Sequence, residues 1–150
     1  MKLFLDTNVI LEYIEHRRFY DDVRCILMAV CEGKHKGMIS QGCVYTLAFL
    51  VERSLKANNI HRPELTIKLR QLLGSILNMV EPAGISRKEM LGALSDEAFK
   101  DLEDSFQYQC ALKNHCQVLI TINIGDFKDA DQSRLEILTP AAFVKRYLMA

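Results

Sequence analysis

The chain has 150 residues, of which 49% are hydrophobic and 25% charged, a size and balance typical of one globular domain. Its 19 basic and 19 acidic residues give no net charge, which argues against a protein that coats nucleic acid but not against an enzyme that cuts it. The five cysteines form no C-x-x-C pair and no apolar run approaches the roughly 20 residues of a membrane span, so we expect reduced thiols, no membrane partner and a cytoplasmic location.

The first predicted element is a buried strand over residues 2–5, which ends abruptly at Asp6, Thr7 and Asn8. An apolar helical pattern resumes at Val9. Three polar side chains therefore lie at a junction between a strand and a helix, where open parallel sheets bind their ligands. Two interpretations of Asp6 stay open at this point. Its carboxylate either meets a cation or several donors, because its burial is otherwise costly, or it only caps the helix.

The rest of the chain alternates between helical and strand-like segments. The pattern predicts helices over 9–15, 20–32, 43–56, 63–77, 86–93, 96–115 and 140–148, and strands around 38–39, 79–82, 117–121 and 135–138. Strands separated by helices predict one domain over residues 1–150, a three-layer α/β/α sandwich with a mostly parallel central sheet. The helix over 43–56 is apolar on nearly all sides, which predicts burial on more than one face or packing against a partner.

Polar side chains also follow a later strand and begin a later helix. Asp101 and Asp104 lie three residues apart near the start of a helix, and Thr121, Asn123 and Asp126 follow a strand. Acidic groups gathered at one edge of a parallel sheet raise each other's pKa unless a counter-charge is present. Mg²⁺ or Mn²⁺ with oxygen ligands supplies that charge. Solvated charges at a helix N-terminus and a turn residue are the alternatives that stay open.

Three segments of the chain resemble the PIN-domain family, which includes the toxin ribonucleases of toxin–antitoxin pairs. They are residues 5–11 (LDTNVIL), 101–108 (DLEDSFQY) and 119–127 (LITINIGDF). Their order and spacing fit the family over essentially the whole chain. The resemblance implies the three-layer α/β/α fold and a Mg²⁺- or Mn²⁺-dependent endoribonuclease with its site at the carboxyl edge of the sheet.

The resemblance also implies roles for single residues. Asp6, Asp104 and Asp126 carry over as the metal-binding and catalytic acids. The supporting positions are Thr7, Asn8, Ser40, Thr46, Asp101, Thr121 and Asn123. One position departs from the family, which usually has a Glu at or near the place of Thr46, an uncharged residue. The nearest acid downstream, Glu52, lies about 9 Å further along the helix and is a poor substitute. Metal binding is therefore expected to be weaker, or to use fewer direct ligands and more water.

The function that follows is cation-assisted hydrolysis of RNA phosphodiesters, in which the ion polarises the phosphate and activates a water molecule. Four basic residues are candidates for contacts with the RNA backbone, with solvated turn charges as the alternative: Arg17, Arg18, Lys34 and Lys36. If the protein is a toxin, a small antitoxin is expected as a partner. The apolar helix over 43–56 is then the expected antitoxin-docking or homodimer surface.

Two other functions stay open. The missing Glu favours a catalytically weakened PIN module that binds RNA or a protein partner. A haloacid-dehalogenase-like phosphatase also begins with an apolar strand and an Asp. That chemistry needs a second Asp two residues further on, where this chain has Asn8.

Overall fold

The structure, a computed structural model, describes residues 1–149. The strands are β1 (Lys2–Leu5), β2 (Lys36–Ser40), β3 (Glu81–Ala83), β4 (Val118–Ile120) and β5 (Glu136–Leu138). The α-helices are α1 (Thr7–Ile14), α2 (Tyr20–Cys31), α3 (Gln41–Ala57), α4 (Glu64–Met79), α5 (Arg87–Ser95), α6 (Leu102–Lys113) and α7 (Pro140–Phe143). The 3₁₀ helix η1 (Ile124–Phe127) follows β4, and the π-helix η2 (Val144–Leu148) continues α7. Strands and helices alternate as predicted.

All the strands in residues 1–149 form one parallel sheet in the order β3-β2-β1-β4-β5. The chain adds β2 and β3 on one side of β1 and then crosses to add β4 and β5 on the other. The space between β1 and β4 is therefore the switch point of the sheet, where open α/β folds bind ligands beyond the carboxyl ends of the strands. Asp6 follows β1 and Thr121 follows β4 at this point.

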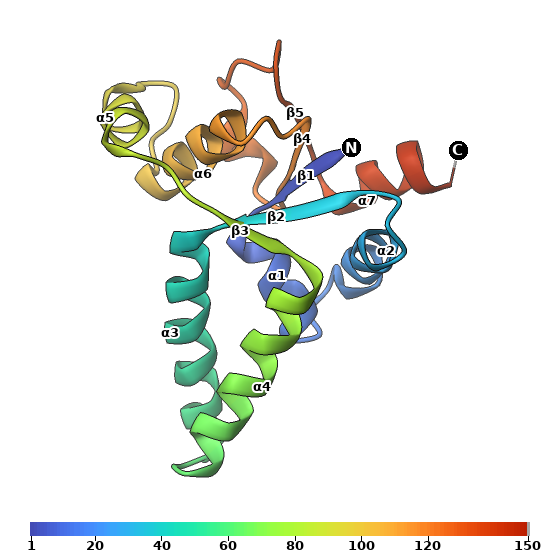
Figure 1. Cartoon of the computed structure of the whole chain (residues 1–150), viewed down its shortest axis with the longest axis vertical. Helices are drawn as coiled ribbons and strands as arrows, with labels where there is room; N and C mark the ends of the chain where they lie inside the picture. Colours follow the sequence, from blue (N-terminus) through green and yellow to red (C-terminus); the bar gives the residue numbers. More distant parts are fainter. Residues whose placement is uncertain (150) are drawn as a thin grey trace.

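The two faces of the sheet carry separate hydrophobic cores because successive side chains of a strand point to opposite faces. Leu3 and Leu5 join a core with α1, α2 and α3, whereas Phe4 joins a second core with Tyr108 and Ala111 of α6. In Figure 1, α5 and α6 lie on one side of the sheet, and α1, α3 and α4 lie on the other. The predicted three-layer α/β/α fold is confirmed.

One predicted helix is shorter than expected. The helix predicted over 96–115 begins only at Leu102, because Asp101 is its N-cap and accepts hydrogen bonds from the amides of Glu103 (2.8 Å) and Asp104 (3.3 Å). Upstream, the Asp96 carboxylate accepts a hydrogen bond from the amide of Ala98 at 3.0 Å. Such a side-chain turn competes with helix formation.

The helix predicted over 43–56 is also less buried than expected. Within α3 only Cys43, Leu47 and Val51 are buried, while Tyr45 and Phe49 are 80% and 64% exposed. The prediction that this helix is buried on more than one face is therefore wrong for the isolated chain. Figure 1 shows that α3 and α4 form a hairpin that projects from the sheet. No helix in the part of the chain that the structure describes has the length and apolar character needed to cross a membrane.

Replacement of Gly37 in β2 tests the packing of the sheet. An added Cβ would lie 2.9 Å from Val80 Cγ1 and 3.2 Å from Val30 Cγ1, and both valines are buried. We expect Gly37→Ala to lower the free energy of unfolding by about 1–3 kcal/mol in urea denaturation. The matched control is Gly92→Ala in α5, where an added Cβ meets nothing within 4 Å. It should stabilise the protein by about 0.5–1 kcal/mol, and equal effects of the two variants would contradict this packing.

Candidate functional site

Asp6 is buried at the carboxyl end of β1, with 2% of its surface exposed. Its Oδ1 accepts hydrogen bonds from the Thr7 amide (2.8 Å) and from Gln107 Nε2 (3.2 Å). Its Oδ2 accepts one from Thr121 Oγ1 at 2.8 Å. Asp6 therefore caps α1 and also collects donors from α6 and from the end of β4, so capping alone does not describe its environment.

A second set of contacts joins α1 to α6 beside this carboxylate. Thr7 Oγ1 donates to Glu103 Oε1 and accepts from Gln107 Nε2, both at 3.2 Å. Neither Glu103 nor Gln107 is among the site residues predicted from the sequence. Helical spacing was the available signal, because Gln107 lies three residues after Asp104 and four after Glu103 and so shares their face of the helix.

Asp104 lies beside this network on the same helix and is only 8% exposed. Burial, followed by the negative charges of Asp6, Asp101, Asp126 and Glu103, raises the pKa of Asp104 to about 7. Burial also raises the pKa of Asp6 above its ordinary value, against the opposing effect of its three hydrogen bonds. Among the described residues none of these five carboxylates forms an ion pair. These carboxylates therefore lack an ion-pair partner in the described part of the chain, and Lys100 and Lys128 line a hollow with only the outer two, Asp101 and Asp126.

The donor chemistry of this edge fits a hard divalent cation. Carboxylates and hydroxyls are the ligands that Mg²⁺ and Mn²⁺ prefer, and Mg²⁺ commonly binds through one or two carboxylates while it keeps several water molecules. Within residues 1–149, no group of three or more His, Cys, Asp or Glu side chains is placed to hold a metal ion. The nearby Cys43 is no thiolate ligand or nucleophile at neutral pH, because burial raises its pKa to about 12.

The later polar residues are divided between the buried network and an exposed loop. Thr121 is fully buried and binds Asp6 directly. Asn123 and Asp126 are exposed, and the backbone N–H of Asn123 donates to Thr121 Oγ1 at 3.1 Å. Asp126 and Asp101 line a hollow of about 280 Å³. The structure thus groups Asp6 and Thr121 in one hydrogen-bonded cluster and places Asp126 at its margin, where its charge still raises the pKa of Asp104.

The second strand contributes Ser40 and Thr46 to a neighbouring cleft. Ser40 is the N-cap of α3, and its hydroxyl accepts a hydrogen bond from the Cys43 amide at 3.0 Å. Ser40 and the half-buried Thr46 line a cleft of about 400 Å³ together with Glu103 and Gln107. A carboxylate from α6 thus faces the same cleft as Thr46, where the family usually has a Glu.

Two other polar residues of the sequence analysis lie apart from the buried network. Glu52 forms ion pairs with Arg62 and, at 3.7 Å, with Lys56. It therefore does not replace the missing Glu. Asn8 is half-buried in the first turn of α1.

The basic residues proposed for RNA contacts do not surround the carboxylates. Lys36 begins β2, at the amino edge of the sheet and opposite Asp6, and it pairs with Glu81 at 2.7 Å. Lys34 precedes the same strand and pairs with Glu32 at 2.6 Å. The expectation that these two lysines contact RNA at the site is therefore wrong, because parallel strands put all their first residues at the edge opposite Asp6. Two arginines, Arg17 and Arg18, follow the far end of α1.

Known proteins share this fold and sequence pattern. Residues 2–125 match the family described as PIN domain. Ribonuclease VapC1 from Aquifex aeolicus (strain VF5) is 23% identical over an alignment of 150 positions. The alignment covers 97% of this chain and 95% of that protein. The crystal structure of VapBC2 from Rickettsia felis bound to a DNA fragment from their promoter contains a chain with the same fold. It superimposes with a TM-score of 0.67 and 19% identity over 91% of this chain and 98% of that chain.

Removal of the Asp104 charge tests the electrostatics of the site. The pKa of Asp104 in the fold, about 7, lies above its ordinary value of 3.8. The protonated group therefore favours the folded state at low pH, and this contribution is lost as the pH rises from about 4 to about 7. In the presence of a chelator, we expect Asp104→Asn to raise the melting temperature at pH 8 by about 3–6 °C, and to raise it much less at pH 4.

The control for this experiment is Asp21→Asn, which removes an exposed carboxylate from the first turn of α2. Its effect on the melting temperature should not depend on pH between 4 and 8 in the way that the effect of Asp104→Asn does. Parallel pH profiles for the wild type and Asp104→Asn would show that Asp104 carries no unfavourable charge in the fold.

Proposed function

The chain belongs to the PIN-domain family, and we propose that it is a Mg²⁺- or Mn²⁺-dependent endoribonuclease that hydrolyses RNA phosphodiesters. The observation that carries this proposal is the pair of buried carboxylates, Asp6 and Asp104, which lie at the switch point of the sheet and form no ion pair within residues 1–149. Similarity to Ribonuclease VapC1 supports the reaction class. We assign the protein to the cytoplasm as the toxin of a toxin–antitoxin pair.

In this proposal Asp6 and Asp104 hold the cation, and Asp126 binds it directly or through water. An ion held there would polarise the scissile phosphate and lower the pKa of a water molecule. Gln107 Nε2 and Thr121 Oγ1 each bind a different oxygen of Asp6, so that the carboxylate plane is fixed before the ion arrives. Such partners orient metal ligands and are nearly as important as the ligands themselves.

The remaining polar residues have proposed roles around the phosphate. The Thr7 hydroxyl is held between Glu103 and Gln107, so its orientation is set by α6. Asn8 and Ser40 lie at the same edge of the sheet, at the starts of α1 and α3. We assign to them, together with the exposed Asn123, contacts with phosphate oxygens or with the attacking water.

The exposed face of α3 is the proposed site for a protein partner. Tyr45 and Phe49 lie four residues apart on one side of the helix and are 80% and 64% exposed, and Ile67 of α4 is also exposed. Exposed aromatic residues are enriched at protein interfaces. We assign this surface to a small antitoxin, with a second copy of the chain as the alternative. VapBC2, which shares the fold, was crystallised with promoter DNA.

A binding module without nuclease activity is the second candidate function. The observation that favours it is the uncharged Thr46 at the usual position of a Glu, together with the absence of a three-ligand metal group in residues 1–149. RNA cleavage with Mn²⁺ separates the two functions. RNA binding without metal-dependent cleavage would favour the module.

Substitution of Asp6 tests the proposed reaction. We expect Asp6→Asn to lower the rate of RNA cleavage in Mn²⁺ at least 100-fold, because removal of a ligand should cost at least as much as removal of its outer partners. Cleavage is measured on structured and single-stranded RNA, and Mn²⁺ binding is measured by electron paramagnetic resonance. Asp21→Asn serves as the control and should cleave at the wild-type rate. Equal activity of Asp6→Asn and the wild type would rule out this site.

Substitution of Gln107 tests the positioning of Asp6. Gln107→Leu keeps a side chain of similar size but removes the donor to Asp6 and Thr7. We expect Mn²⁺ affinity and cleavage rate to fall about 10- to 100-fold, and Gln107→Glu to fail to restore them because it brings another acceptor to Asp6. Wild-type Mn²⁺ affinity in a folded Gln107→Leu protein would show that Gln107 does not position the carboxylate.

A further inference from the structure

A cleft beside the carboxylates has no role in the function proposed so far. It encloses about 400 Å³ between the start of α3, the segment 83–90 and α6. Its walls are largely apolar, with Ile85, Met90 and Phe106, and its polar groups include Gln41 and Glu103. None of the residues that line it is Lys, Arg or His.

The cleft lies next to the proposed catalytic centre and shares two side chains of α6 with it. Glu103 lines the cleft and accepts a hydrogen bond from Thr7. Gln107 lines it as well and donates to Asp6. A molecule in the cleft is therefore separated from the carboxylates by single side chains. The nucleotide next to a phosphate bound at Asp6 is the part of an RNA chain that fits this position.

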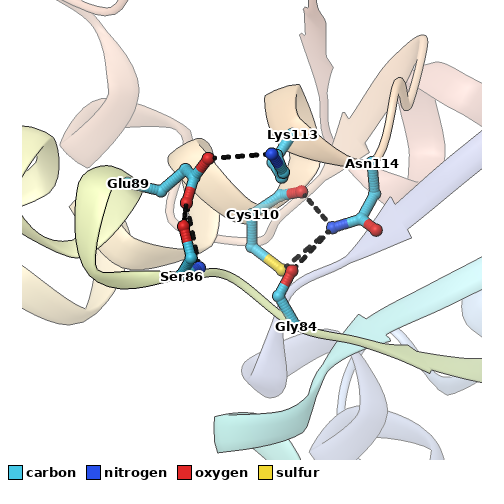
Figure 2. Close-up of polar contacts among 6 residues, drawn as sticks. All are labelled: Gly84, Ser86, Glu89, Cys110, Lys113 and Asn114. Carbon is cyan, nitrogen blue, oxygen red and sulfur yellow. Dashed lines mark hydrogen bonds and ion pairs between the residues drawn. The ribbon is translucent and has the colours of Figure 1, made fainter.

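The outer wall of the cleft is fixed in place by contacts to α6. Figure 2 shows that Asn114 Nδ2 donates to the Gly84 carbonyl, at 3.2 Å. It also shows the Glu89 carboxylate joining Ser86, whose amide donates to it at 2.9 Å, to Lys113, whose ammonium lies 3.1 Å away. Two separate contacts thus attach the segment 83–90 to the last turn of α6 and its C-cap. The cleft is preformed, as small-molecule sites usually are.

The chemistry of the cleft matches a nucleobase. Without a basic side chain it is unsuited to a phosphate or a carboxylate. Phe106 and Met90 offer apolar surface to a flat ring, and RNA-binding proteins commonly stack single-stranded bases on such side chains. Glu103 can accept a hydrogen bond from an exocyclic amine, and the carboxamide of Gln41 offers both a donor and an acceptor. An amino-bearing base therefore fits better than uracil.

The carboxamide of Gln41 packs against Gly84, where a larger residue would crowd it. A Cβ at position 84 would lie 3.0 Å from Gln41 Oε1 and 3.3 Å from its Cδ. The side chain of Gln41 therefore lies directly against the backbone of the outer wall, at the border of the cleft. A polar group at this position can contact the edge of a base whose ring lies against Phe106 and Met90.

We propose that this cleft binds one amino-bearing base of single-stranded RNA next to the phosphate that is cut, and thereby sets the sequence preference of cleavage. The proposal rests on the ribonuclease function proposed above. It requires the cleft to be open when RNA binds, so a side chain that fills the cleft should remove the preference.

The test uses Gly42, which lines the cleft at the start of α3. An added Cβ there meets only Ser40 Oγ, at 3.9 Å, so a side chain can enter without displacing the core. The matched control is Gly92→Leu in α5, outside the cleft, where an added Cβ meets nothing within 4 Å. The substrate is a pool of single-stranded RNAs with randomised bases, and the products are sequenced to identify the bases on each side of the cut.

We expect the wild type and Gly92→Leu to prefer adenine, cytosine or guanine over uracil at one position next to the cut, on the order of tenfold or more. Gly42→Leu should reduce this preference to less than about twofold. Cleavage by the wild type without a base preference, or an unchanged preference in folded Gly42→Leu, would overturn the proposal and leave the ribonuclease function intact.

A second measurement is independent of cleavage. Asp6→Asn, with a chelator, is titrated with adenosine, cytidine, guanosine and uridine 5′-monophosphates while backbone amide signals are followed by nuclear magnetic resonance. We expect saturable shifts of the amide signals of residues 41–46, 84–90 and 103–107. The shifts should be larger for at least one amino-bearing nucleotide than for uridine monophosphate. They should be absent in the double variant that carries Asp6→Asn and Gly42→Leu. These shifts in a protein whose wild type does not cleave RNA would support the cleft and reject the ribonuclease function. No saturable shifts in these segments at millimolar nucleotide would overturn the cleft proposal.

Discussion

The arrangement of this protein depends on two carboxylates that are buried at one edge of a parallel sheet and form no ion pair in the part of the chain that the structure describes. Asp6 is accommodated by three hydrogen bonds, from Thr7, Gln107 and Thr121. Burial and the neighbouring negative charges raise the pKa of Asp104 to about 7, so this carboxyl group is partly protonated at neutral pH. Burial of charge is costly unless a partner is present, so this edge is where a cation would lower the free energy of the folded chain most.

The fold places these groups together through topology. The switch between β1 and β4 leaves a space beyond their carboxyl ends, and the first helix and α6 both reach it. The same geometry separates this edge from the amino ends of the strands, where Lys34 and Lys36 are neutralised by neighbouring glutamates. The parallel direction of the strands therefore places the carboxylates that form no ion pair and these paired lysines at opposite edges of the sheet.

Much of this architecture could be predicted from periodicity. Apolar strands and amphipathic helices alternate clearly enough to indicate a parallel α/β sheet, and Asp6 follows the first strand so directly that its place at the edge could be inferred. The hydrogen bonds from Gln107 could not, because they join residues about 100 positions apart through the packing of α6 on the sheet. For a related reason the sequence could not decide between the two expectations for the outward face of α3. Apolar composition alone does not distinguish burial in the same chain from exposure of Tyr45 and Phe49 to a partner.

The most direct test of the account is an anomalous difference map from a crystal of the protein soaked in Mn²⁺. We expect one peak at the carboxyl edge of the sheet, about 2–2.5 Å from oxygens of Asp6 and Asp104 or joined to them through ordered water, with Asp126 bound directly or through water. A fully soaked crystal with no peak there, or with its ion bound elsewhere, would contradict the claim that these carboxylates share one cation.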